Sequence, residues 1–237
     1  HERAEPAFRR AVELLGAHGA PWELATALHS LGMLDRARGR LDEAESRTRE
    51  ALAIRQKQED LRGIALSLQA LGEIALDRAD GAVARTCFAQ SLKLSEELGD
   101  QQGIAELLTL LAVLDVAEGR LDRAAEQLAR ALTQQIELGY AIGGAKALEA
   151  IVVWSSATER PEVGSQALGA AHALRAAKGI PRQPNEQRAL EPAIRRLKAL
   201  ASPETVERAF RDGRDRGIDD AVRVLVAALG NASRAEA

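Results

Sequence analysis

Few residues of this 237-residue chain have the types and spacing that chemistry requires. Residues 143–146 read Gly-Gly-Ala-Lys, which could indicate a phosphate-binding loop of backbone amides and a lysine. That loop needs the pattern GxxxxGK[ST] after a strand, and the chain does not contain it. Gly143 instead lies in register with Gly63 and Gly103, each 40 residues from the next, so we expect these glycines to open helices.

The other residue types that could carry chemistry are scattered. Cys87 is the only cysteine, which excludes an internal disulfide and, without a histidine pattern beside it, predicts a buried, inert thiol. Adjacent carboxylates such as Glu96 and Glu97 point in different directions on a helix. The histidines never show the paired spacing of metal ligands; they are His1, His18, His29 and His172. We therefore expect no enzyme, no catalytic residue, no metal and no cofactor.

Composition and charge narrow the classes of partner. The net charge of −3 comes from 32 basic and 35 acidic residues that are interspersed, which argues against direct nucleic-acid contact or an anionic membrane surface. No apolar run approaches the roughly 18–20 residues of a membrane span, and we expect no signal peptide. A single cysteine suits a reducing compartment. We expect a cytoplasmic protein without membrane contact.

The chain repeats itself every 40 residues. The segment LGMLDRARGRLDEAE at Leu31 returns as LAVLDVAEGRLDRAA at Leu111, with LGEIALDRADGAVAR at Leu71 between them. A fourth, more divergent copy, IVVWSSATERPEVGS, begins at Ile151 without insertion or deletion. Such periods indicate stacked supersecondary units, and the abundance of Ala, Leu, Glu and Arg predicts that each unit is helical.

Each copy is predicted to be a pair of helices. The first helix carries an apolar stripe and ends near Gly39 or Gly119, because glycine takes the left-handed conformation at low cost. The second is expected to start at Asp42 or Asp122, with the carboxylate as N-cap. Small residues recur where the helices of a pair must approach each other; examples are Gly32, Gly72, Ala44, Ala84, Ala124, Ala51, Ser91 and Ala131.

This pattern resembles the tetratricopeptide repeat. The resemblance rests on the Leu-Gly pairs at 31–32 and 71–72 and on Ala44 and Ala51 of the second helix, and it covers about residues 1–180. The period exceeds the usual length of about 34 residues, and of the consensus aromatic positions only Phe88 keeps a ring. The resemblance implies an all-α, right-handed α-solenoid, a superhelix of helix-turn-helix repeats.

Beyond residue 180 the period fails. Residues 181–237 are predicted to form a helical C-terminal cap, with helices in EQRALEPAIRRLKALAS, SPETVERAFRDGRDRG and DDAVRVLVAALG. The region is similar to the C-terminal stretch of large bacterial regulators that join a STAND-class ATPase to tetratricopeptide-like repeats, some with a LuxR-type DNA-binding domain. The matching residues are Leu168, Gly169, Ala170, Ala171, Ala209, Phe210, Gly213, Ala221 and Leu229.

The start of the chain adds one expectation. The sequence opens with His1 and not Met, and residues 1–19 align with 41–59 by the same period. We therefore expect an excised piece of a longer polypeptide that starts in mid-repeat. The resemblance would make it the sensor arm of a signalling or transcriptional regulator.

The resemblance also implies a partner-binding groove lined by the first helix of each repeat, suited to a peptide or partner helix. Its positions are Thr26, His29, Met33, Arg36, Leu66, Gln69, Glu73, Leu76, Glu106, Thr109, Val113, Val116, Lys146, Glu149 and Val153. Exchange of both Glu73 and Glu106 for lysine is expected to weaken the binding of a basic partner without lowering the melting temperature of the protein. Equally, this face could be solvated or covered by the C-terminal helices.

Two alternatives to a protein-interaction module remain open. One is a receptor for a small-molecule effector held between the repeats and the cap, and the other is self-association into a homo-oligomer. The sequence names neither the partner nor the effector.

Overall fold

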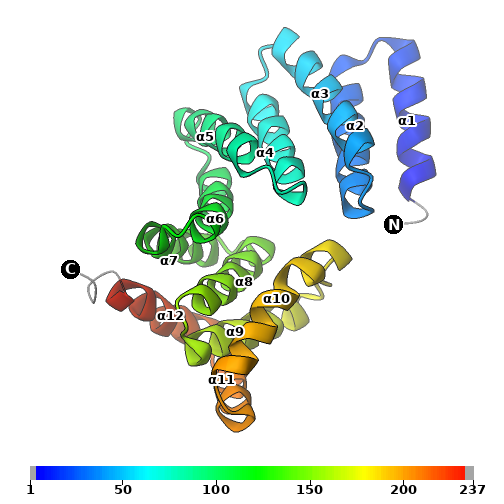
Figure 1. Cartoon of the computed structure of the whole chain (residues 1–237). Coiled ribbons are helices and arrows are strands. Elements are labelled where there is room, and N and C mark those ends of the chain that lie inside the picture. Colours follow the sequence, from blue (N-terminus) through cyan, green and yellow to red (C-terminus); the bar gives the residue numbers. More distant parts are fainter. Residues whose placement is uncertain (1–3, 233–237) are drawn as a thin grey trace. The chain divides into compact units, whose positions relative to one another are not determined.

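The computed structural model describes residues 4–232, and within that range it contains twelve helices and no strand. Figure 1 shows the helices following one another as hairpins. The chain opens with α1 (Ala4–His18). The predicted all-α, repeat-built fold class is confirmed, because helices within each compact unit pack against their successive neighbours.

The eight helices after α1 begin at intervals of 20 residues, so each 40-residue period holds one helix pair. The first helices of the pairs are α2 (Pro21–Ala37), α4 (Leu61–Asp77), α6 (Gln101–Ala117) and α8 (Ala141–Ala157). The second helices are α3 (Leu41–Lys57), α5 (Gly81–Glu97), α7 (Leu121–Glu137) and α9 (Pro161–Lys178). The fourth copy therefore forms the same pair as the first three, despite its divergent sequence.

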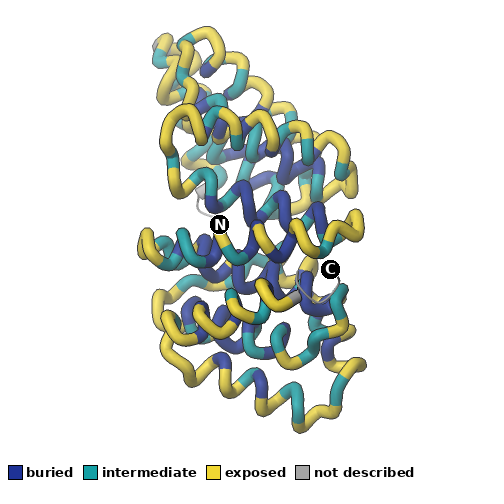
Figure 2. The backbone as a smooth tube through the Cα atoms, turned by 90° about the vertical axis from the view of Figure 1, so that its left-hand side faces the viewer, coloured by how far each residue is buried: buried dark blue, intermediate teal, exposed yellow. Residues whose placement is uncertain are grey.

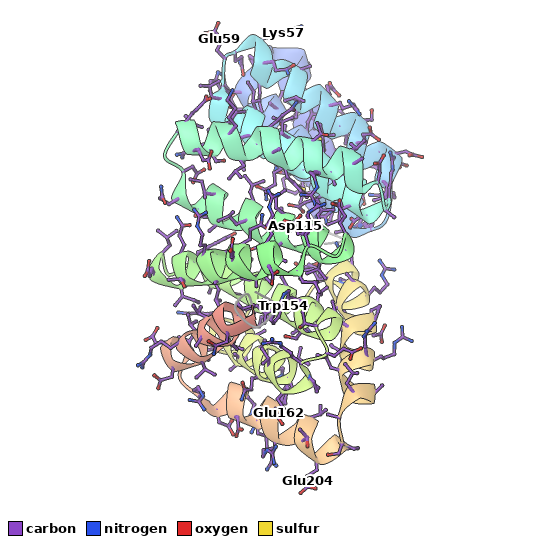
Figure 3. The ribbon with its side chains drawn as sticks, turned by 60° about the vertical axis from the view of Figure 1, so that its left-hand side comes forward. Lys57, Glu59, Asp115, Trp154, Glu162 and Glu204 are labelled. Carbon is purple, nitrogen blue, oxygen red and sulfur yellow. The ribbon has the colours of Figure 1, made fainter. Side chains whose placement is uncertain are left out.

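A left-handed residue closes each helix from α1 to α9, again at intervals of 20 residues. Glycine fills six of these positions, and Gly39 and Gly119 have φ angles of 77° and 76°, as predicted. The remaining three are filled by Glu59, Ala79 and Glu159, with φ between 54° and 60°. Figure 3 shows Glu59 at such a turn. A non-glycine residue there bears a conformational cost, since its Cβ crowds the backbone.

The predicted N-caps at Asp42 and Asp122 are wrong. Helices α3 and α7 already begin at Leu41 and Leu121, and no side chain caps either of them. Asp42 is instead exposed in the first turn and pairs with Arg78. Aspartate caps occur on other helices. Asp60 accepts from the Gly63 amide at 2.9 Å on α4, and Asp80 accepts from the Val83 amide at 3.1 Å on α5.

The packing divides the chain into two compact units, residues 1–100 and residues 101–237. The division falls inside the predicted repeat region and not at residue 180. The helices after residue 180 therefore share a compact unit with the last two repeats. We call the two parts unit 1 and unit 2.

Unit 1 is held together by close approach of small residues, as predicted. Ala44, Ala51 and Ala84 are completely buried. A Cβ on Gly72 of α4 would lie 2.4 Å from the ring of Phe88, which is itself fully buried in α5. Figure 2 shows how buried stretches alternate with exposed ones along the helices. The glycine thus makes room for the aromatic ring.

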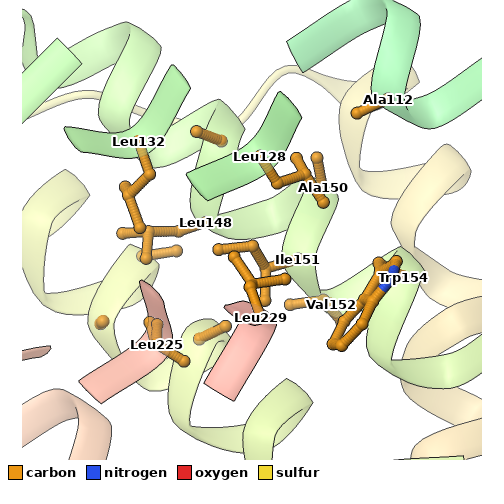
Figure 4. Close-up of a cluster of buried hydrophobic side chains, with 14 of the residues drawn as sticks. Ala112, Leu128, Leu132, Leu148, Ala150, Ile151, Val152, Trp154, Leu225 and Leu229 are labelled. Carbon is orange, nitrogen blue, oxygen red and sulfur yellow. The ribbon is translucent and has the colours of Figure 1, made fainter. Parts of the chain in front are cut away.

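Unit 2 contains a larger apolar core. Leu128 and Leu132 of α7 and Ile151 of α8 are completely buried in it. Figure 4 shows Leu225 and Leu229 on the same cluster; they come from α12 (Ile218–Ala232), which packs on α7 and α9.

Trp154 of α8 is a second part of this core. Its indole nitrogen donates a 3.0 Å hydrogen bond to the carbonyl of Leu121 at the start of α7. The ring is 1% exposed and lies among the helices of unit 2, and the Arg160 guanidinium stacks over it at 5.6 Å. Its one polar atom is thus satisfied, as burial of an indole requires.

Two further helices complete unit 2. They are α10 (Pro184–Leu200), which packs on α8 and α9, and α11 (Pro203–Asp215), which packs along α9. A Cβ on Gly169 of α9 would lie 2.1 Å from the Phe210 carbonyl oxygen, and one on Gly213 of α11 would lie 2.0 Å from that of Gln166. Only glycine permits two backbones to approach this closely.

Candidate functional site

The candidate partner surface of unit 1 lies on the first helices α2 and α4. Thr26 and Leu66 are exposed, and the remaining predicted positions except Glu73 are partly buried. Leu66 is 45% exposed. The face therefore combines an exposed apolar side chain with the partly exposed side chains of Met33 and Leu76. We call it the α2–α4 surface.

An ion-pair network links the two helices of this surface. Arg36 of α2 donates from Nε to Asp77 Oδ2 at 2.7 Å and also pairs with Glu73 of α4. Glu73 is only 6% exposed, and its Oε1 accepts a 3.1 Å hydrogen bond from Gln69. The charges of the α2–α4 surface are therefore largely neutralised by one another, and they stabilise the helix pair.

This pairing corrects the expected effect of exchanging Glu73 for lysine. The buried carboxylate of Glu73 neutralises Arg36, so a lysine would place two cations together and remove a buried acceptor. The exchange is therefore expected to lower the melting temperature, contrary to the sequence-based expectation. Glu73 holds the surface together, and an uncharged exposed residue such as Leu66 is the better probe of binding.

His29 is the titratable group most perturbed on this surface. Burial and, to a smaller extent, the nearby Arg55 lower its pKa from 6.5 to about 4, while Glu73 opposes the shift. The Nδ1 atom is buried without a hydrogen-bond partner among residues 4–232. The imidazole is thus neutral at physiological pH, which fits the ordinary polar role predicted for it and not a proton-transfer role.

In unit 2 the predicted positions on α6 are engaged within the fold. Thr109 is buried; its hydroxyl donates to the Ala105 carbonyl at 3.1 Å and accepts from Gln135 Nε2 at 3.2 Å. Val113 and Val116 pack on the core and are partly exposed, and Glu106 accepts from Gln102 at 3.3 Å. The α6 positions thus contribute more to packing than to an open surface.

The predicted positions on α8 lie where α10 packs. Glu149 is 8% exposed and accepts from Arg175 Nε at 2.8 Å and from Arg182 Nη2 at 2.6 Å. Lys146 lies 3.8 Å from Glu186 at the start of α10. Val153, the third position on this helix, packs partly exposed against the core. Glu149 is therefore committed to holding the C-terminal helices and is closed to a partner.

A buried polar row in the second helices escaped sequence reasoning. Arg55, Gln135 and Arg175 are buried in register, and each reaches a first helix with its side-chain nitrogen. Arg55 donates to the Gly63 carbonyl at 3.0 Å and Gln135 to the Ala105 carbonyl at 3.1 Å. Ser95 is the fourth member in register and is also buried. The signal was a polar residue every 40 positions on an otherwise small or apolar face.

The residues that could have carried chemistry do not form a site. Residues 143–146 lie inside helix α8 and not in a loop, and a Cβ on Gly143 would overlap Gln135. Cys87 is partly buried, and burial raises the pKa of its thiol, which disfavours the reactive thiolate. His1 lies outside the described residues, and the side chain of His18 is likewise not described.

The described residues contain neither a metal-binding cluster nor a membrane-spanning helix. No group of three histidine, cysteine or carboxylate residues within 4–232 could hold a metal ion. In the same range no helix has both the length and the apolar character needed to cross a membrane. No protein-family model matches the chain, and no curated protein shows significant similarity to it.

Proposed function

We propose that this chain is a non-enzymatic protein-interaction module that binds a peptide or partner helix on the α2–α4 surface. The observation that carries the proposal is the exposed side chain of Leu66, which lies on the same pair of first helices of unit 1 as the partly exposed Met33 and Leu76. Exposed apolar anchors on a rigid helical face are what a bound segment with hydrophobic side chains requires.

The wider context follows from the resemblance to tetratricopeptide repeats. The chain would be the interaction or sensor arm of a larger bacterial signalling or transcriptional regulator of the STAND or LuxR type. Binding on the α2–α4 surface would favour one arrangement of the repeats and so regulate an attached ATPase or effector domain. The repeat period and the C-terminal residues that carry the resemblance support this placement.

Site-specific photocrosslinking tests the proposal. A benzophenone amino acid is placed at Leu66 or, as a matched control, at Val83 of α5, because both side chains are 45% exposed. The protein is then irradiated in cells of the organism that encodes it. We expect a discrete adduct from position 66 that position 83 does not give and that Met33→Asp removes. Identical adducts at both positions, or none at 66, would contradict the proposal.

A further inference from the structure

A cleft of about 500 Å³ opens between α9, α10 and α11 of unit 2. Two separate attachments keep it open. The first fixes α11 against α9 through the close approach at Gly169 and Gly213. The second fixes the start of α10 against α8 and α9. Glu149 of α8 accepts from Arg182, which lies just before α10, and Arg175 of α9 donates to Glu186 in the first turn of α10. Since α10 and α11 are held by separate attachments and contact each other little, the space between them is built into the fold.

The walls of the cleft are mostly apolar. Leu168 of α9, Ile194 of α10 and Val206 and Phe210 of α11 line it, and all four are only partly buried. The Phe210 ring is tilted by 57° against the imidazole of His172, with the ring centres 5.9 Å apart. A flat, apolar ring of a ligand could therefore pack against these side chains and contact the aromatic ring of Phe210. The volume lies in the range of small-molecule sites, roughly 300–1,000 Å³.

The rim of the cleft carries an excess of positive charge. Arg195 and Lys198 of α10 line it, and neither has an ion-pair partner among residues 4–232. Of the two acids on the rim, Glu207 lies 3.8 Å from Arg211, which leaves Glu191 as the single uncompensated carboxylate. Arg195 and Lys198 are one turn apart on one helix, so they can hold a single anion together.

We propose that this cleft binds a small aromatic anion, with the ring against Leu168 and Phe210 and the acidic group between Arg195 and Lys198. This site is independent of the α2–α4 surface. It gives a location and a ligand class to the effector that sequence reasoning left open. Because the walls are fixed by separate attachments, the ligand enters a preformed site and binding needs little rearrangement.

The probes for the test are 8-anilinonaphthalene-1-sulfonate, followed by fluorescence, and 1-naphthoate, followed by calorimetry. We expect saturable binding of one molecule per chain, with 1-naphthoate displacing the fluorescent probe. The uncharged 1-naphthalenemethanol should bind at least tenfold more weakly than 1-naphthoate, because it gains nothing from the two cations.

Variants locate the site. The double variant Arg195→Gln, Lys198→Gln should bind 1-naphthoate at least tenfold more weakly than the wild type. Its circular dichroism should be unchanged, since both residues lie on the cleft rim. The matched control, Lys178→Gln with Arg188→Gln, removes two exposed cations outside the cleft and should leave affinity unchanged. Val206→Trp should fill the cleft and abolish binding.

Several outcomes would overturn the proposal. They are no saturable binding of either probe by the wild-type chain at millimolar concentration, equal loss of affinity in the cleft and control pairs, or unchanged binding in the Val206→Trp variant. None of these results depends on a protein partner, so they leave the proposed function of the α2–α4 surface separately testable.

Discussion

Arg40 donates a 2.8 Å hydrogen bond from Nε to Oδ1 of Asp35, a carboxylate that is completely buried at the end of α2. The same bond, also 2.8 Å, joins Arg120 to the buried Asp115 two periods later. In both places the arginine stands in the turn before the second helix, so the pair ties the turn to the helix that precedes it. A second arginine, Arg47 or Arg123, reaches the same carboxylate from the second helix.

Replacement of Arg40 by glutamine should destabilise unit 1. The buried carboxylate of Asp35 would lose its main partner, and an undersatisfied buried acceptor typically costs about 1–3 kcal/mol. Urea unfolding followed by circular dichroism measures the change. The control is Arg62→Gln, because Arg62 is exposed. Equal stability of the two variants would show that the pair contributes nothing.

Replacement of Ala79 by glycine should raise stability. Ala79 has a φ of 60°, a conformation that costs a non-glycine residue about 1–2 kcal/mol, whereas glycine loses about 0.5–1 kcal/mol more entropy on folding. The reverse exchange, Gly39→Ala, should lower stability, because the φ of Gly39 is 77°. No atom lies within 4 Å of the new Cβ, so the loss would come from the backbone conformation and not from a clash. Thermal denaturation of both variants decides. A shift of both melting temperatures in one direction would contradict the argument.

Alanine at Gly169 or Gly213 should separate α9 from α11. Each new Cβ would lie about 2 Å from a backbone carbonyl oxygen, so the helices must move apart, at the roughly 1–3 kcal/mol typical of overpacking. Gly230→Ala is the control, because no atom lies within 4 Å of that position in α12. Hydrogen exchange of α11 amides, followed by mass spectrometry, should quicken in the first two variants only. Unchanged protection would refute the close crossing.

Acidification should destabilise unit 1 through His29. Its pKa falls from 6.5 in the unfolded chain to about 4 in the fold, so between these values the unfolded chain binds a proton that the folded chain does not. The free energy of unfolding therefore decreases as the pH falls through this range, by at most about 3 kcal/mol.

Urea unfolding between pH 6.5 and 5 isolates the histidine, since most carboxylates titrate lower. In this range the slope of stability against pH should be smaller in His29→Gln than in the wild type. An identical slope in the two proteins would assign the pH dependence to other groups.

Much of the fold could be predicted because the repeat is regular. The recurrence of Leu31 at Leu71 and Leu111 gave the period, and Gly39 and Gly119 indicated where helices end. The N-caps were missed because Asp42 and Asp60 look alike in sequence. Whether an aspartate falls at the cap or in the first turn depends on where the helix begins: α3 begins one residue before Asp42, whereas α4 begins one residue after Asp60.

The candidate surface was only partly readable from the sequence. Periodicity places Leu66 and Glu149 on first helices at positions of the predicted groove. It cannot tell that Leu66 is exposed whereas Glu149 is bound by Arg175 and Arg182. Those arginines lie 26 and 33 residues further along the chain, outside the reach of any local pattern.

The sequence by itself determined the all-helical repeat, its period and the small residues that let helices approach, because these depend on local propensity and on contacts between neighbouring elements. Only the tertiary structure decided the division after Asp100, the packing of α10 on α8 and the cleft between α10 and α11. These features depend on contacts between side chains and backbones that no local sequence pattern specifies. Examples are the buried ion pair of Glu149 with Arg175 and the close backbone approach at Gly169 and Gly213.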